Sequence, residues 1–256
     1  MPSRSKILLL SLSIFLLLVS ITMALHGKNQ GDSTAPNKEE ATSVQEGVMT
    51  AKEVVHSKIY KKEYEWRKGQ KLSNLRGTGE AQVIVAPPSV PSAPNLPPLT
   101  INSFLRIRWC DADAVVIGVV KSKSSQLTED ETFTFTQYEM NVEEVIKNNA
   151  TAPIAPNSNI DITRPGGAIL LHGRIIRAID LSFPPLKVGG HYLLFLRSIP
   201  ATGAYKAFSR QGDFQLENNS FTPLTRELLP NDLQSGGDAA TLLTTIRAID
   251  SDGCNK

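Results

Sequence analysis

The second half of the chain carries short apolar runs separated by turn-forming residues, which is the pattern of β-strands. β-Branched residues dominate positions 112–120, and a polar turn is expected over 121–130. Further apolar runs follow at short intervals up to residue 196. We therefore expect residues 101–256 to form one mainly β domain.

The middle of this region gives the clearest signals for individual strands and turns. Residues 159–163 alternate between apolar and polar side chains and end at a proline-glycine turn. Two more runs, 169–171 and 174–179, flank the dipeptide His172-Gly173. A two-residue connection between strands is typical of a β-hairpin, so we expect these runs to pair with each other.

The stretch from 132 to 147 is too long for one straight strand. At about 3.3 Å per residue it would reach roughly 50 Å. Its apolar positions change phase twice, from Phe133 and Phe135 to Tyr138, Met140 and Val142, and then to Val145. Each change of phase predicts a β-bulge. Bulged and strongly bent strands let a small sheet close on itself, so the sequence predicts a small closed β-barrel.

One later strand, residues 192–196, is apolar on both faces and therefore needs cover on both sides. The barrel interior would cover one face. A C-terminal helix would cover the other, because Leu242, Leu243, Ile246 and Ile249 repeat at helical spacing. Asp238 is placed as its N-cap and Gly253 as its stop.

The N-terminus has the features of an export signal. Basic residues Arg4 and Lys6 precede an apolar run, and small residues lead up to Ala24. We expect residues 1–24 to be a signal peptide cleaved after Ala24, giving a secreted or periplasmic protein. The alternative is an uncleaved membrane anchor, because the apolar run approaches the roughly 20 residues that span a bilayer.

Residues 25–100 are polar and proline-rich, and we expect them to form a largely disordered tether in front of the domain. Helical spacing of apolar residues predicts an amphipathic helix over 43–68, capped by Ser43 and Glu46. Its basic and aromatic end, residues 58–68, would suit an anionic surface. A solvated helix face is the simpler interpretation, because Glu63 and Glu65 dilute the positive charge.

The charge balance limits the class of partner. Removing the signal peptide takes away two basic residues and no acidic one, so 27 basic and 25 acidic residues become 25 of each. A neutral mature chain without a dominant basic stretch argues against nucleic acid. An extracytoplasmic protein or a small anionic ligand fits better, with a membrane as partner only if the N-terminal segment stays uncleaved.

Cys110 and Cys254 are the only cysteines of the chain. Export would place both thiols in an oxidising compartment, where an even number of cysteines favours a disulfide. The bond would tie the C-terminal helix to the start of the first strand. A buried, unpaired couple is the alternative.

Two stretches resemble the netrin-like module, the oligonucleotide/oligosaccharide-binding (OB) type of barrel found in tissue inhibitors of metalloproteinases. The first, CDADAVVIG at 110–118, is similar to the opening strand of that family, and the second, VGGHYLLF at 188–195, is similar to its later Gly-x-x-Tyr-Leu strand. The resemblance covers residues 110–224 and extends to exported bacterial proteins. It implies an OB-like barrel.

The resemblance does not bring zinc-directed inhibition with it. The metalloproteinase inhibitors act through a Cys-x-Cys at the mature amino terminus, whereas Cys110 lies deep in the chain behind Arg108 and Trp109. The four histidines are scattered, without the spacing of metal ligands. We find no nucleophile elbow or phosphate-binding glycine loop, and so expect no catalytic residues, metal or cofactor.

The expected function is therefore that of a non-enzymatic, exported binding or protein-interaction module. Its candidate ligand surface is formed by Arg164, His172, Arg174 and Arg177, which flank one turn region and could hold an anion. Ordinary solvated surface is the alternative. Two other functions stay open: a protease inhibitor acting through barrel loops, and a hydrolase with an unrecognised site.

Overall fold

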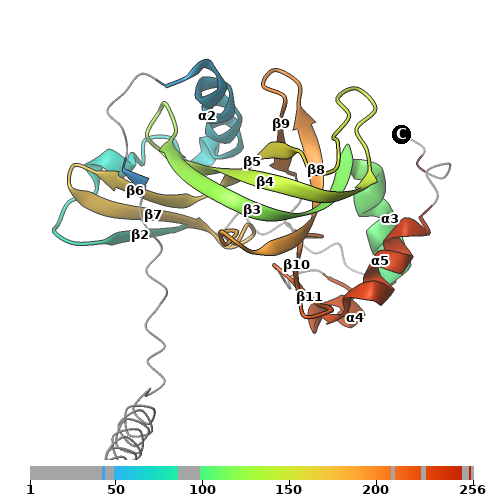
Figure 1. Cartoon of the computed structure of the whole chain (residues 1–256). Helices are drawn as coiled ribbons and strands as arrows, with labels where there is room; N and C mark the ends of the chain where they lie inside the picture. Colours follow the sequence, from blue (N-terminus) through green and yellow to red (C-terminus); the bar gives the residue numbers. More distant parts are fainter. Residues whose placement is uncertain are drawn as a thin grey trace, which may run out of the picture. The chain divides into compact units, whose positions relative to one another are not determined.

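The computed structural model of the chain describes residues 42–43, 49–85, 99–208, 211–225, 229–249 and 254. The expected signal peptide, the proline-rich stretch at 86–98 and the helix stop at Gly253 lie outside these residues. Within them the fold is mainly β, with two sheets, a helix near the N-terminal end and helices packed at the C-terminal end (Figure 1).

The large sheet contains eight strands in the order β12-β11-β10-β8-β3-β4-β5-β9. Besides pairing in parallel with β5, β9 pairs antiparallel with β8. Each strand of the set β3, β4, β5, β9 and β8 therefore has two neighbours within that set. The strands are β3 (Ala114–Leu127), β4 (Thr134–Lys147), β5 (Asn159–Pro165), β8 (His191–Ile199), β9 (Ala204–Ala207), β10 (Phe214–Glu217), β11 (Ser220–Pro223) and β12 (Gly237–Asp238).

The small sheet has the order β1-β6-β7-β2 and contains the predicted hairpin. The hairpin strands β6 (Gly167–Leu171) and β7 (Arg174–Asp180) pair antiparallel across His172 and Gly173. Both turn residues have positive φ, 50° and 75°, as a two-residue hairpin turn of this kind requires. Two strands from the N-terminal region, β1 (Thr42–Ser43) and β2 (Ala81–Val85), pair in parallel with β6 and β7.

The strand β3 is longer than expected. It begins at Ala114, two residues after the predicted start, and continues to Leu127 through the stretch that we expected to be a turn. Polar residues remain in the strand because they pair across to β4. The hydroxyls of Ser125 and Thr136, for example, lie 2.9 Å apart. Cross-strand hydroxyl pairs of this kind stabilise a sheet without apolar side chains.

One of the two predicted bulges in β4 is confirmed. The register with β3 shifts between Val142 and Glu144, where the second change of phase lies. The first change has another cause, since pairing is unbroken from Phe135 to Tyr138. Phe135 faces a cluster under the N-terminal helix, whereas Tyr138 and Met140 face the opposite cluster. Two-sided burial, and not a bulge, produces that change of pattern.

The expected tether is partly folded. Residues 51–85 form α2 (Ala51–Glu63), the 3-10 helices η1 (Glu65–Arg67) and η2 (Leu72–Asn74), and β2. The capping box of α2 is made by Thr50 and Glu53, whereas Ser43 belongs to β1. The segment is ordered because its large side chains Tyr60 and Leu72 are each only 1% exposed in a shared apolar cluster.

The C-terminal helix α5 (Ala239–Arg247) forms as predicted behind Asp238, whose carboxylate accepts a 2.7 Å hydrogen bond from the backbone N–H of Thr241. With α4 (Asn231–Gln234) it covers one side of the large sheet. The two-sided burial of β8 is also confirmed. Leu193 packs in the cluster that holds Leu242 of α5, and Leu194 packs in the opposite cluster.

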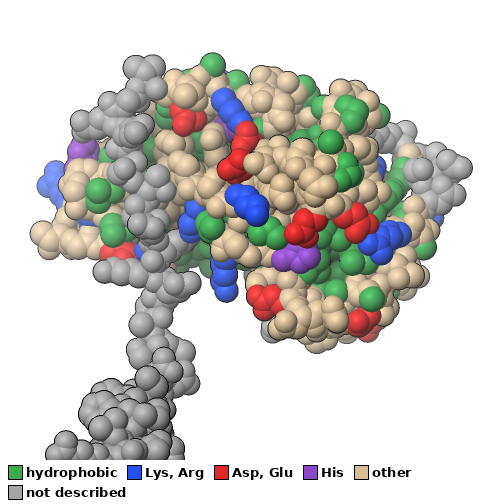
Figure 2. Space-filling view, viewed as in Figure 1, with side chains coloured by type: hydrophobic (Ala, Val, Ile, Leu, Met, Phe, Trp, Pro, Cys, Tyr) green, Lys and Arg blue, Asp and Glu red, His purple; other side chains and the backbone are tan. Residues whose placement is uncertain are grey.

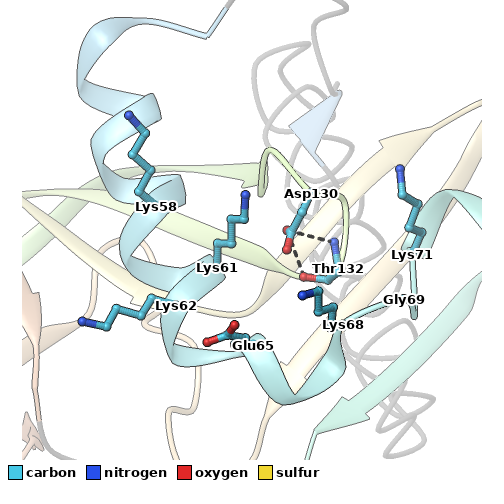
Figure 3. Close-up of a pocket in the computed structure, with 9 residues that line it drawn as sticks. All are labelled: Lys58, Lys61, Lys62, Glu65, Lys68, Gly69, Lys71, Asp130 and Thr132. Atoms are coloured by element: carbon cyan, nitrogen blue, oxygen red, sulfur yellow. Dashed lines mark hydrogen bonds between the residues drawn. The ribbon is translucent and has the colours of Figure 1, made fainter.

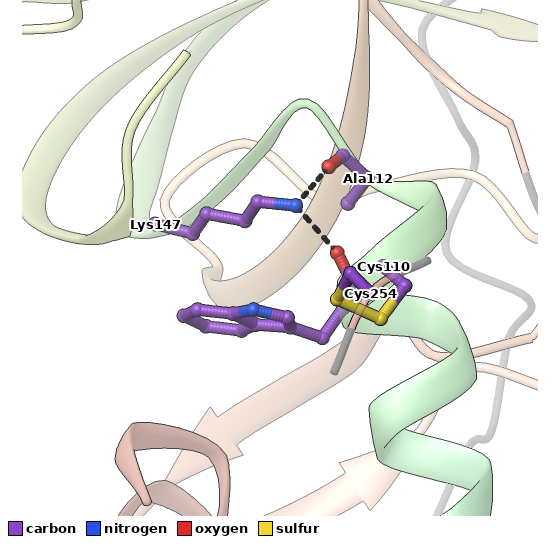
Figure 4. The surroundings of a disulfide bond; sticks show 5 residues. Cys110, Ala112, Lys147 and Cys254 are labelled. Carbon is purple, nitrogen blue, oxygen red and sulfur yellow. Dashed lines mark hydrogen bonds between the residues drawn. A yellow bond between two sulfur atoms is a disulfide. The ribbon is translucent and has the colours of Figure 1, made fainter. Parts of the chain in front are cut away.

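Cys110 and Cys254 form the predicted disulfide, with their Cα atoms 5.2 Å apart (Figure 4). Cys110 lies in the last turn of α3 (Ile101–Asp111), a helix that we did not predict, and not in the opening strand. Lys147 of β4 also fixes the C-terminal end of α3. Its ammonium group donates hydrogen bonds to the carbonyls of Trp109 and Ala112 at 2.6 and 2.5 Å.

Candidate functional site

The four residues of the predicted ligand surface do not come together. Arg164 is buried, with 2% of its side chain exposed, and pairs with Asp213 at 2.5 Å. His172 is exposed at the tip of the β6–β7 hairpin. Arg164 is therefore part of the core and cannot meet a ligand at the surface.

The other two arginines hold the N-terminal segment against the small sheet. Arg174 donates hydrogen bonds to the carbonyls of Gly79 at 2.8 Å and Leu75 at 3.1 Å. Arg177 pairs with Glu80. Both guanidinium groups thus fix residues 75–80 in front of β2. The structure thus gives each of these arginines a partner within the chain, and a shared anion site at them stays a prediction.

A different group of cations surrounds a hollow beside α2 (Figure 3). Its volume is about 620 Å³. We call it the lysine hollow, and it is lined by Lys58, Lys61, Lys62, Glu65, Lys68, Gly69, Lys71, Asp130 and Thr132. Five lysines and only two acidic residues thus line the hollow. Over the face of the molecule in Figure 2, in contrast, basic and acidic side chains are interspersed.

The wall that carries the lysines is positioned by buried residues between them. The ring of Tyr64 stacks on Phe133 with centroids 4.0 Å apart. Arg67 is buried and donates through Nε to the carbonyl of Thr132 at 3.3 Å. These contacts bring the turn at Lys68 and Gly69 over the β3–β4 loop. Gly69 has a φ of 89°, a conformation that favours glycine in such a turn.

The opposite wall is the β3–β4 loop, residues 128–133. Asp130 accepts hydrogen bonds from the hydroxyls of Thr128 at 2.8 Å and Thr132 at 2.9 Å. Partial burial would raise the pKa of Asp130, but these hydrogen bonds outweigh it, and with the charge of Lys61 they lower the pKa below its usual value. The carboxylate is thus held within its own loop as an anion, and its charge acts on Lys61 in the opposite wall.

Four of the five cations of the lysine hollow are available to a ligand. Lys71 lies 3.5 Å from Glu131. Lys58, Lys61, Lys62 and Lys68 are exposed and make no ion pair among the residues that the structure describes. In Figure 3, Lys61 and Lys68 extend toward the β3–β4 loop, whereas Lys62 points away from it. The positive charge is therefore spread around the hollow, and does not converge on one point.

The inner face of α2 carries a buried histidine that is held on both sides. Gln137 donates to His56 Nδ1 at 3.0 Å, so Nε2 carries the proton and faces the hydroxyl of Thr202 at 3.1 Å. Burial, together with the charge of Lys52, lowers the pKa of His56 to about 4, against the opposing effect of Asp161 and Glu53. The imidazole is therefore neutral in the folded protein at neutral pH.

This histidine makes stability depend on pH. The pKa of His56 is about 4 when folded and 6.5 in its reference state, so the unfolded chain binds the extra proton first as the pH falls. The stability that the protein gains from the lowered pKa of His56 is fully present above pH 6.5, and it is lost progressively as the pH falls to 4. We expect the melting temperature to fall across this window, and to fall less in His56→Gln. Thermal melts followed by circular dichroism at pH 4, 5, 6 and 7 measure this change. If the melting temperature fell equally steeply with pH in both proteins, the prediction would be contradicted.

Two further kinds of site are absent from the described ranges. No cluster of three or more histidine, cysteine, aspartate or glutamate side chains there is arranged to hold a metal ion. No helix within those ranges has the length and hydrophobicity that crossing a bilayer demands.

Sequence reasoning singled out part of the lysine hollow without recognising it. The run 58–68 is basic and aromatic, and the solvated face of a helix is the simpler interpretation of that pattern. What the sequence does not show is the loop that closes the hollow, because Asp130 and Thr132 lie more than 60 positions further along. Comparison with models of known protein families gave no match, and a search of curated proteins gave none either.

Proposed function

We propose that this protein is an exported, non-enzymatic binding module that takes an anionic ligand in the lysine hollow. The observation that carries the proposal is the gathering of five lysines around one hollow with two carboxylates, one of them already bonded within its own loop. Such a surface attracts anions over a distance of about one Debye length, roughly 8 to 10 Å at physiological salt.

The pairing of the strands supports the finer assignment of the fold. In chain order β3, β4, β5, β8 and β9 are strands one to five, and their partners form the cycle 1-2-3-5-4-1 with the third and fifth strands parallel. We propose that they make a closed barrel of the OB type, as the resemblance to the netrin-like module implies. The disulfide is compatible with an extracellular location.

The distribution of the lysines favours a ligand with several charges. A single phosphate needs donors that converge within hydrogen-bonding distance of one another. Here the lysines surround a wide hollow, and Lys62 points away from the loop that Lys61 and Lys68 approach. We therefore propose a flexible polyanion that carries phosphate or sulfate groups. Protease inhibition through the barrel loops and hydrolysis stay predictions, because no contact described above favours either.

The test is a binding titration of the mature chain with two probes, inorganic polyphosphate and a sulfated polysaccharide, followed by calorimetry. We expect both to bind at low salt, and the affinity to fall as salt rises. Exposed charge pairs contribute about 0.2–1 kcal/mol each, so the double variant Lys61→Ala/Lys68→Ala should bind about two- to thirtyfold more weakly.

The matched control removes the same charge elsewhere. Lys121 and Lys187 are also exposed, and neither lines the hollow. The double variant Lys121→Ala/Lys187→Ala should keep its affinity within about twofold, since only distant and screened charge is lost. Equal weakening in the two double variants, or no binding of either probe by the unaltered protein, would overturn the proposal. Binding of one probe alone would identify the chemical group that is recognised.

A further inference from the structure

The lysines of the hollow belong to a segment that lies across the large sheet. We call residues 50–74, which contain α2, η1 and η2, the strap. Figure 1 shows α2 above the edge of the sheet that contains β4 and β5, and polar side chains of the strap reach three parts of the fold. His56 bonds to Gln137 of β4 and to Thr202 in the β8–β9 turn, and Lys52 pairs with Asp161 of β5.

Aromatic contacts fix the same face of the strap. Tyr60 stacks on Phe135 with ring centroids 5.5 Å apart, and Tyr64 stacks on Phe133. The hydroxyl of Tyr64 also donates to the carboxylate of Asp180 at the end of β7. Both tyrosines are buried. Stacked aromatic pairs contribute to stability beyond the apolar area that they bury, so these two contacts favour the docked strap.

The strap also contacts the loop that forms the far wall of the hollow. Ser57 Oγ accepts a hydrogen bond from the backbone N–H of Glu129 at 2.7 Å. The backbone N–H of Leu72 donates to the carbonyl of Glu131 at 2.7 Å, and Ser73 donates to the carboxylate of Glu131. The strap therefore holds the β3–β4 loop at two points, one at Glu129 and the other at Glu131.

These contacts coincide with the place where OB barrels bind ligands. In such barrels the ligand lies on the second and third strands, between the loop joining strands one and two and the loop joining strands four and five. On the proposed assignment these are β4 and β5, the β3–β4 loop and the β8–β9 turn. The strap contacts all four, through Gln137, Asp161, Glu129 and Thr202.

We infer that the barrel binds its own strap on this face, and that the lysine hollow exists only while the strap is docked. One wall of the hollow is the strap, from Lys58 to Lys71, and the other is the β3–β4 loop with Asp130 and Thr132. None of the residues that line the hollow lies between Lys71 and Asp130 in the sequence. A polyanion that fills the hollow must therefore stabilise the docked strap, because a ligand stabilises the state that binds it.

This inference rests on the proposed function, and its test separates the two. Hydrogen exchange of the mature chain, followed by mass spectrometry, is compared with and without saturating polyphosphate. We expect exchange to slow in α2 and in residues 128–133, and to stay unchanged in α5, which lies outside the site. Unchanged exchange in α2 at saturation would overturn the inference, and would leave the proposed function intact.

A docking variant gives the second measurement. Tyr64→Ala removes the stack on Phe133 and the bond to Asp180 while all five lysines remain. His56→Ala is a milder variant in case the first does not fold, and circular dichroism checks both. We expect polyphosphate affinity to fall about tenfold in either. If a folded docking variant binds like the unaltered protein while Lys61→Ala/Lys68→Ala binds weakly, the inference fails and the proposed function stands.

Discussion

Replacing Asp213 with alanine is expected to lower the free energy of unfolding by about 3–5 kcal/mol. Its side chain is 7% exposed and pairs with Arg164, which is 2% exposed. Asp213 also accepts a 3.3 Å hydrogen bond from the backbone N–H of Phe195 in β8. The substitution would leave the guanidinium charge buried without its partner, and an unpaired buried charge is among the most destabilising changes known in a protein core.

The effect can be measured by urea denaturation against a matched surface pair. Arg247 of α5 makes a two-pronged ion pair with Glu144, but these side chains are 48% and 42% exposed. Glu144→Ala should therefore cost only about 0–1 kcal/mol, because water solvates whatever charge is left. If Asp213→Ala and Glu144→Ala lowered the free energy of unfolding by similar amounts, burial would not explain how much the pair of Arg164 and Asp213 stabilises the protein.

Removing the disulfide is the second change with a large expected effect. The bond joins positions 144 residues apart. The double variant Cys110→Ser/Cys254→Ser should lose about 2–5 kcal/mol of stability, the upper figure being that of the loop-entropy model for so long a closure. The loss arises mainly in the unfolded chain, which becomes free to expand. Urea denaturation of the oxidised protein and the double variant provides the comparison.

A reducing agent supplies the control for this prediction. Dithiothreitol should destabilise the unaltered protein to the level of the double variant and leave the double variant itself unchanged. Mass spectrometry of a non-reduced digest identifies the linked peptides. If the reducing agent lowered the stability of both proteins equally, the loss would come from something other than the bond between Cys110 and Cys254.

The parts of the fold that sequence reasoning predicts are those with strong local signals. The α5 helix combines an N-cap at Asp238 with apolar residues at helical spacing. The β6–β7 hairpin depends on two adjacent residues, His172 and Gly173, that accept positive φ. The two-sided apolar pattern of β8 correctly predicts two covering layers. Each of these signals lies within about ten residues of the element that it specifies.

The parts that sequence reasoning misses depend on partners far along the chain. The strap looked like a polar tether, because Tyr60 becomes a core residue only through contact with Phe135. Arg164 looked like a surface cation because its partner Asp213 lies 49 positions later. In the same way, the lysine hollow needs a wall from the β3–β4 loop, which no pattern within residues 58–71 indicates.

The pairing of the N-terminal strands also has a consequence for how the chain folds. Among the described strands, β2 pairs with β7 alone, which begins 89 residues after the end of β2, and β1 pairs with β6. The strap likewise rests on β4, β5 and the β8–β9 turn. Contacts between such distant segments form slowly. The segment that leaves the ribosome first therefore cannot complete its contacts until residues up to Thr202 have been made. Until it docks, the ring faces of Phe133 and Phe135 that Tyr64 and Tyr60 cover stay exposed.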